Sequence, residues 1–194
     1  MNLTSLLKTL VETESPSHDK AAVDRVGAIV AEEARKLGAQ VDVIQNDETG
    51  NHILARFQPL DTAQDKPSIL ILCHMDTVFP LGTIQKTPFR EDGEKIFGPG
   101  TLDMKAGIVI ALAAIKEAQK NGLTRPVTLL CTSDEEIGSH TSRALIETRA
   151  IESALVLVMG ASPRRTSGCP SKPSTGKVAR SGAVLNTENF IGPV

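Results

Sequence analysis

The sequence predicts an α/β fold: a three-layer sandwich in which helices cover both faces of a mixed, mostly parallel central sheet. Short apolar runs of strand length alternate with longer segments whose apolar residues recur at helical spacing. Two of the short runs, 68–73 and 127–131, are almost wholly apolar, which is typical of strands buried on both faces of a sheet. Alternation of strands and helices favours parallel strands joined by right-handed crossovers.

The helices are predicted from apolar periodicity and from the residues at their ends. The first begins at about Leu3 and ends before the Ser-Pro-Ser segment 15–17, because proline removes a donor and restricts the residue before it. The second begins after Asp19, a suitable N-cap, and ends at Gly38. Two further helices are predicted over residues 106–120 and 142–149.

The strands and the domain boundary follow from the same pattern. Strands are predicted over residues 41–44, 52–57, 68–73, 127–131 and 154–158. After Met159 the apolar periodicity stops, and the rest of the chain is rich in Ser, Pro, Gly, Arg and Lys. We therefore expect residues 1–159 to form one folded unit, and residues 160–194 to be a tail of loop or disorder that departs from the pattern.

Composition excludes several functional classes. The chain has 194 residues with a net charge of -2, and aromatic residues make up only 3%, which disfavours a nucleic-acid-binding surface. No signal peptide and no run of membrane-spanning length is recognisable, so we expect a cytoplasmic protein that does not bind a membrane. The cysteines Cys73, Cys131 and Cys169 contain no CxxC pair, so neither a cysteine metal site nor a disulfide framework is expected.

Acidic residues and one histidine follow buried strands or a glycine-rich turn. His74 and Asp76 follow one predicted strand, Glu135 and Glu136 follow another, and Asp103 lies between a Gly-Pro-Gly turn and a helix. Side chains at such positions can meet at one edge of a sheet. One imidazole with several carboxylates suits a divalent metal, with zinc the first candidate. In a metal-dependent hydrolase, a carboxylate beside the metal ligands can act as the general base.

Each of these residues also has a simpler interpretation. A lone histidine such as His74 is more often a hydrogen-bonded structural residue, and Asp103 could be the N-cap of the following helix. The run that contains Glu135 and Glu136 could be a solvated acidic turn. The order of the clusters and their strand-turn-helix context favour the metal site. The other histidines, His18, His52 and His140, lie outside these clusters and are expected to be surface or structural residues.

Together these segments resemble the M20 metallopeptidase family, most closely its glutamate carboxypeptidase branch. His74-Met75-Asp76-Thr77-Val78 resembles the HxDTV segment of that family. The other similar segments are 98–107, 134–139 and, near the start of the chain, 14–17. The resemblance covers about Leu3 to Met159.

The resemblance implies a site with two zinc ions, for which Co²⁺ or Mn²⁺ can substitute. His74 would bind one ion, Asp103 would bridge both, and Glu136 would bind the other. Glu135 would be the general base and Asp76 would orient the imidazole, while the peptide bond after Asp103 would be cis. The substrate would be a small peptide or an N-acyl amino acid. Glu135 would take a proton from a metal-activated water and pass it to the leaving amine.

The chain departs from the family pattern after the strand at 154–158. There the family supplies a fourth ligand, usually in a Glu-Pro pair, whereas this sequence reads Met-Gly-Ala-Ser at 159–162. By the same resemblance, we expect the family's fifth ligand, most of its lid domain, through which members often form homodimers, and the C-terminal part of its catalytic domain to be missing as well. Deleting one nucleotide from one coding of these residues gives Met-Glu-Pro, which suggests a frameshift near codon 160. Sequencing the gene through that codon tests the hypothesis.

These observations predict a zinc-dependent hydrolase of peptide or amide bonds, most similar to a glutamate carboxypeptidase. An alternative is an N-acyl-amino-acid deacylase of the acetylornithine deacetylase type, because the motifs do not specify the side chain that is recognised. An alternative of another class is an inactive fragment or a non-catalytic binding remnant, because metal ligands are missing. We expect the chain alone to be weakly active or inactive. A nucleotide-binding protein is disfavoured, since the Gly-Pro-Gly turn lacks the spacing of a phosphate loop.

Overall fold

The computed structural model describes residues 2–59 and 65–160. Its helices are α1 (Leu3–Glu12), α2 (Lys20–Lys36), α3 (Thr83–Lys86), α4 (Ala106–Lys120) and α5 (Arg143–Ile151). Its strands are β1 (Gln40–Ile44), β2 (His52–Phe57), β3 (Ser68–His74), β4 (Arg90–Asp92), β5 (Lys95–Phe97), β6 (Val127–Thr132) and β7 (Ser153–Val158). Two short turns complete the description, the irregular η2 (Thr101–Lys105) and the 3₁₀ turn η3 (Glu135–Ile137).

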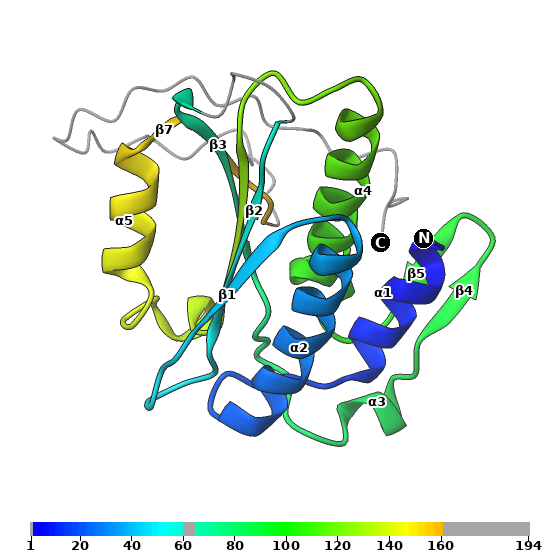
Figure 1. The fold of residues 1–194 in the computed structure, drawn as a ribbon. Coiled ribbons are helices and arrows are strands. Elements are labelled where there is room, and N and C mark those ends of the chain that lie inside the picture. Colours follow the sequence, from blue (N-terminus) through cyan, green and yellow to red (C-terminus); the bar gives the residue numbers. More distant parts are fainter. Residues whose placement is uncertain (1, 60–64, 161–194) are drawn as a thin grey trace, which may run out of the picture.

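The central sheet is mixed and mostly parallel, as the sequence predicts. Its five strands lie in the order β1-β2-β6-β3-β7 (Figure 1). β6, β3 and β7 are parallel neighbours, whereas β2 is antiparallel to both β1 and β6. Every strand of this sheet except β2 therefore runs in the same direction. The carboxyl ends of β3 and β6 consequently lie side by side at one edge.

Helices cover both faces of the sheet, which confirms the three-layer sandwich (Figure 1). α1, α2 and α4 lie on one face and bury the larger apolar core, to which Leu10, Val26 and Leu112 belong. α5 lies on the other face, where it packs on a smaller cluster built around Leu70 and Leu130. β3 and β6 are buried from both sides by these two layers, and this explains why their sequences are almost continuously apolar.

The predicted helix ends are confirmed in detail. Asp19 is the N-cap of α2, and its carboxylate accepts a hydrogen bond of 2.9 Å from the Ala22 N–H. Gly38 follows the same helix with φ +84°, a conformation that glycine adopts without steric cost. The sequence did not predict α3 or the β4–β5 hairpin. Both are very short, and an element of three or four residues carries too little periodicity to be recognised.

The segment before α2 pairs with the chain that leaves β3. The Thr77 N–H donates to the Ser15 carbonyl at 2.8 Å, and the Ser17 N–H donates to the Thr77 carbonyl at 3.2 Å. The Ser15 hydroxyl also donates to the Met75 carbonyl at 2.7 Å. These contacts join residues about sixty positions apart, and they hold the chain in place where it leaves the sheet after His74.

Gly107, in the first turn of α4, gives a testable packing constraint. A Cβ at this position would lie 2.7 Å from the Met159 carbonyl oxygen and 2.7 Å from Met104 Cε. We expect Gly107→Ala to lower the free energy of unfolding by about 1–3 kcal/mol, because backbone atoms must move to admit the methyl group. Urea denaturation measures the change.

The matched control is Gly27→Ala in α2, where the nearest heavy atom to the added Cβ is 3.5 Å away. This substitution removes a helical glycine without a clash and should be neutral or stabilising by up to about 1 kcal/mol. Equal effects of the two substitutions would show that the close approach to Met159 is not what requires glycine at position 107.

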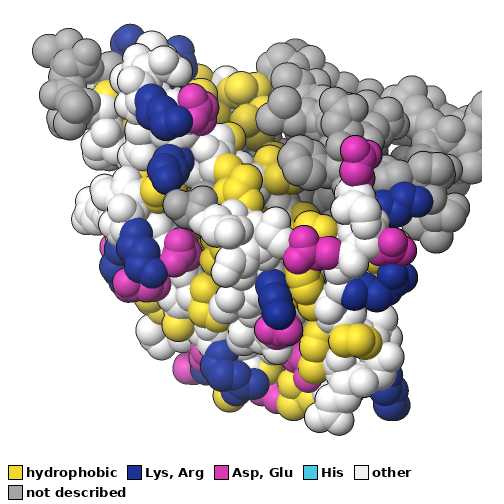
Figure 2. Space-filling model, turned by 90° about the vertical axis from the view of Figure 1, so that its right-hand side faces the viewer, with side chains coloured by type: hydrophobic (Ala, Val, Ile, Leu, Met, Phe, Trp, Pro, Cys, Tyr) yellow, Lys and Arg dark blue, Asp and Glu magenta, His cyan; other side chains and the backbone are white. Residues whose placement is uncertain are grey.

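The described surface carries both signs of charge. On the face shown in Figure 2, Lys and Arg side chains are interspersed with Asp and Glu side chains, and no continuous basic area is visible among the described residues. Within residues 2–59 and 65–160, no helix combines the length and the apolar character needed to cross a membrane.

Candidate metal centre

Three side chains predicted as metal ligands converge. One nitrogen of His74 and one carboxylate oxygen each of Asp103 and Glu136 all lie within 4.8 Å of one another. His74 ends β3, Glu136 lies in η3 just after β6, and Asp103 lies in η2 before α4. β3 and β6 bring two of the three together, because His74 pairs with Thr132 in the parallel register. Residues from three separate segments therefore meet at one edge of the sheet.

His74 is held in a fixed orientation. Its side chain is 5% exposed, and its Nδ1 lies 3.1 Å from the Asp76 carbonyl oxygen and 3.3 Å from Asp76 Oδ1. Nε2 lies 3.1 Å from Asp103 Oδ1 and 3.7 Å from Glu135 Oε2. Since Asp76 occupies Nδ1, the nitrogen available to a metal is Nε2, which faces the acidic residues.

Asp76 joins the segments that form the site. Its carboxylate is fully buried and accepts hydrogen bonds from the Glu135 N–H at 3.2 Å and from the Glu136 N–H at 3.1 Å. The Ser17 hydroxyl donates to the same carboxylate at 2.7 Å. The Asp76 side chain thus orients the imidazole of His74 and also holds the backbone of Glu135 and Glu136 in place.

Asp103 does not cap α4. The residue at the N-cap is Lys105, and no side chain makes a capping hydrogen bond there. The Asp103 side chain is instead half-exposed and directed at His74. The Asp103–Met104 peptide bond is cis, as the family resemblance implies. The structure therefore excludes the interpretation of Asp103 as the N-cap of α4.

The buried Lys105 side chain connects the turn η2 to the end of α1. Its Nζ donates to the carbonyls of Leu10 and Thr13 at 2.8 Å each, at the end of α1. Burial lowers the pKa of Lys105 to about 7, and the charge of Glu14 acts in the opposite direction. The ammonium group satisfies carbonyls that a helix end leaves without partners. Lys105 lies within the segment 98–107 that resembles the family, but the sequence did not indicate its contact with α1.

The acidic run after β6 separates into different roles. The Asp134 carboxylate turns away from the site and accepts hydrogen bonds from Thr141 and Ser142. The Glu135 side chain is 54% exposed, which the solvated-turn interpretation also expects. Glu136, however, points at His74 and Asp103, and the backbone N–H groups of both glutamates bind Asp76. The run is thus a hydrogen-bonded turn that presents two of its three carboxylates at the cluster.

The electrostatics of the cluster fit a cation. Burial opposes the charged form of the His74 imidazole, but the hydrogen bond and charge of Asp76, and then the charges of Glu135 and Asp103, raise its pKa to about 9. Burial and then the charge of Asp103 raise the pKa of the Glu136 carboxyl. The carboxylates of Asp76, Asp103 and Glu135 contribute to both shifts, which fits negative charge gathered around His74 and Glu136. An imidazole and two carboxylates form a donor set that suits zinc and similar divalent ions.

The chain leaves β7 next to the end of β3, and the residue there, Gly160, has no side chain that could bind a metal. β7 is parallel to β3, with Leu72 opposite Val158, and the Met159 N–H donates to the Leu72 carbonyl at 2.9 Å. Continuing the register brings Gly160 level with His74. Among the described residues, no heavy atom lies within 4 Å of a Cβ built at Gly160. The resemblance places a fourth ligand at this position, and glycine provides no ligand atom.

The remaining histidines differ in their surroundings. His52 is buried, with Nδ1 3.0 Å from Ser133 Oγ and Nε2 3.3 Å from Thr141 Oγ1, which confirms it as structural. Burial lowers the pKa of His52. His140 is exposed. His18 is exposed too, but it lines a cavity beside Glu136, a position that the sequence analysis missed because no motif includes it.

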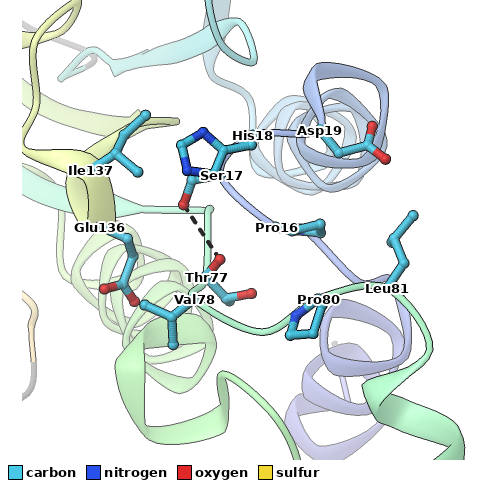
Figure 3. A pocket seen from close by; sticks show the side chains of 10 residues that line it. All are labelled: Pro16, Ser17, His18, Asp19, Thr77, Val78, Pro80, Leu81, Glu136 and Ile137. Carbon is cyan, nitrogen blue, oxygen red and sulfur yellow. Dashed lines mark hydrogen bonds between the residues drawn. The ribbon is translucent and has the colours of Figure 1, made fainter.

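A cavity of about 500 Å³ opens next to the cluster (Figure 3). Glu136 belongs both to its wall and to the candidate metal site. The remaining wall comes from the segment before α2, the loop after β3 and the turn η3. Its other lining residues are Pro16, Ser17, His18, Asp19, Thr77, Val78, Pro80, Leu81 and Ile137.

A mixed α/β sandwich with a histidine and carboxylates gathered at its strand ends is an arrangement that suits a metal-dependent hydrolase. Residues 70–174 match the peptidase family M20/M25/M40, so the chain belongs to that family. The matched range includes β3, α4, β6 and the candidate ligands His74, Asp103 and Glu136. It also extends past the last described residue, Gly160.

Two curated relatives are similar over most of the chain. Carboxypeptidase G2 of Pseudomonas sp. (strain RS-16) is 31% identical over 148 residues, which are 74% of this chain and 35% of that protein. Acetylornithine deacetylase of Photorhabdus laumondii is 31% identical over 139 residues, which are 68% of this chain and 35% of that protein. The chain thus spans about a third of the length of these relatives.

Solved structures support the fold. The crystal structure of an M20 family metallo-carboxypeptidase from Sulfolobus solfataricus superposes with a TM-score of 0.67 at 24% identity, covering 83% of this chain and 38% of that one. At this identity the similarity establishes the α/β fold. The chain is therefore an M20-type peptidase sequence with the corresponding fold, and the family is metal-dependent.

Proposed function

We propose that this chain carries the metal-binding part of a hydrolase that cleaves a peptide or amide bond, of the metallocarboxypeptidase type. The observation that carries the proposal is the convergence of His74, Asp103 and Glu136 within 4.8 Å. Membership in the M20 family and the similarity to a carboxypeptidase support the class of reaction. The preference for a C-terminal glutamate, and for zinc over Co²⁺ or Mn²⁺, remains a prediction from the sequence.

Each residue has a proposed role. His74 Nε2, Asp103 and Glu136 bind the metal, which when bound polarises a scissile carbonyl and acidifies a water. Asp76 holds the imidazole so that Nε2 faces the site. The Glu135 carboxylate, 3.7 Å from His74 Nε2, accepts a proton from the water and later donates it to the leaving amine. Its exposure leaves it free to reach a substrate.

A second candidate is an N-acyl-amino-acid deacylase. The acetylornithine deacetylase relative is 31% identical, the same value as carboxypeptidase G2, so identity does not favour either activity. Both reactions cleave an amide by the same chemistry and differ in the group that is recognised. Hydrolysis of N-acetylornithine compared with that of peptides ending in glutamate separates the two candidates, with a full-length relative as the reference.

The activity of this chain alone is expected to be weak. The three candidate ligands can complete one metal site only in part, and two ions would share Asp103 with a single further protein ligand each. A remnant that folds but does not catalyse is therefore the alternative from another class. Metal content after purification distinguishes the two, because bound zinc supports the hydrolase and a metal-free chain supports the remnant.

Zinc titration tests the proposed ligands. Calorimetry should give saturable zinc binding by the chain, and His74→Gln should weaken that binding by at least about tenfold, because the variant removes the only nitrogen ligand. Glu135→Gln should leave zinc affinity nearly unchanged while abolishing any hydrolysis, since the proposed base does not bind the ion. Equal zinc binding by the chain and by His74→Gln would contradict the proposed site.

A further inference from the structure

The cavity beside Glu136 has mainly apolar walls. Pro16, Val78, Pro80, Leu81 and Ile137 line it, and Figure 3 shows Val78 with Glu136 on one side and Pro80 with Leu81 on the opposite side. Val78 is 66% exposed and Leu81 is 53% exposed. When an apolar ligand covers side chains this exposed, apolar surface of both partners is removed from water, and this favours binding.

The charged lining is acidic. Glu136 and Asp19 supply carboxylates, and none of the ten residues in Figure 3 is Lys or Arg. The Asp19 carboxylate already caps α2, so it is not free to bind a cationic ligand without a competing interaction. An anionic group in this cavity would face the carboxylates of Glu136 and Asp19 and find no Lys or Arg among the lining residues, where His18 is the only basic side chain.

We propose that this cavity is a substrate subsite that takes an uncharged apolar side chain or acyl group and rejects an anionic one. The inference rests on the proposed function, because it takes the ligand to be the substrate of the metal site that shares Glu136. A volume of about 500 Å³ lies within the usual range of ligand pockets. Any carboxylate on the substrate, including that of a C-terminal glutamate, must then bind elsewhere.

Matched ligands test the proposal by direct binding. N-acetyl-leucine is compared with N-acetyl-aspartate, and hexanoylglycine with succinylglycine, so that each pair differs mainly in the charge of one group. Nuclear magnetic resonance follows the amide signals of Val78, Leu81 and Ile137 in the full chain during each titration. We expect the apolar member of at least one pair to bind about tenfold more tightly, with shifts centred on these residues.

Two variants assign the preference to the cavity. Leu81→Lys places an ammonium group in the wall, where it can pair with an anionic ligand, and should abolish the preference for the apolar ligand. Leu3→Lys is the control, because Leu3 is also an exposed leucine (41%) but lies in α1 and does not line the cavity. Val78→Lys serves in place of Leu81→Lys if that variant fails to fold by circular dichroism.

The titrations are run with and without Zn²⁺, which separates the two proposals. Zinc binding without an apolar preference overturns the subsite and leaves the proposed function intact. An apolar preference in a chain that binds no zinc supports the subsite and contradicts the proposed metal site. Tighter binding of the anionic ligands, or no shift at the cavity residues with any ligand, overturns the subsite.

Discussion

Replacing Asp76 with asparagine is expected to weaken zinc binding by about 10- to 100-fold and to lower the free energy of unfolding by about 2–4 kcal/mol. The carboxylate accepts from the Ser17 hydroxyl and from the N–H groups of Glu135 and Glu136, and it also faces His74 Nδ1. An amide has only one acceptor oxygen, and its NH₂ group would meet donors on one side. The variant therefore leaves buried donors without an acceptor.

The loss of metal affinity has a separate cause from the loss of stability. Without the carboxylate beside Nδ1, the imidazole of His74 is no longer held with Nε2 toward Asp103. The backbone under Glu136 is also released, because its N–H loses its acceptor. Calorimetric zinc titration measures the affinity, and urea denaturation of the metal-free chain measures the stability.

Asp134→Asn is the matched control. Asp134 is as fully buried as Asp76 and accepts hydrogen bonds from the Thr141 and Ser142 N–H groups, but its carboxylate faces away from the metal site. This variant should lower stability while changing zinc affinity much less. Similar losses of affinity in the two variants would mean that general loosening of the turn, and not the orientation of His74, controls metal binding.

The sequence predicted the central sheet because its signals are local and strong. The apolar runs of β3 and β6 and the periodicity of α4 each extend over a full element, so burial on both faces could be inferred. The convergence of His74 and Glu136 followed from the rule that neighbouring parallel strands present their carboxyl ends at one edge. The sequence allowed two interpretations of Asp103, and the fold distinguishes them, because Asp103 lies near His74 and does not cap α4.

The supporting contacts could not be predicted because they are not local. Ser17 reaches Asp76 across 59 positions, and Lys105 reaches Leu10 across 95. No periodicity or spacing in a single sequence encodes such pairs. His18 lies outside all of the acidic clusters recognised in the sequence, yet it lines the wall of the cavity near Glu136. Sequence patterns thus identified the candidate ligands, whereas the residues that hold and surround them required the fold.

Replacing Gly160 with glutamate is expected to raise zinc affinity by at least about tenfold, because it adds a carboxylate to a site with too few protein ligands. The register of β3 and β7 ends with Leu72 opposite Val158, and extending it by two residues would place Gly160 level with His74, where side chains of parallel strands point to the same face. A Cβ at Gly160 would meet no heavy atom of the described residues within 4 Å. The family resemblance places a fourth ligand here.

Gly160→Gln separates ligation from the effect of side-chain size, since glutamine has the same shape and no charge. Zinc should bind more tightly to the Glu variant than to the Gln variant, and the thermal midpoint in excess zinc should rise accordingly. In a His74→Gln background the gain should shrink, because both side chains serve one ion and their effects are coupled. If both variants bind zinc like the unmodified chain, then the end of β7 does not reach the ion, and the loss of a ligand at this position cannot explain weak activity.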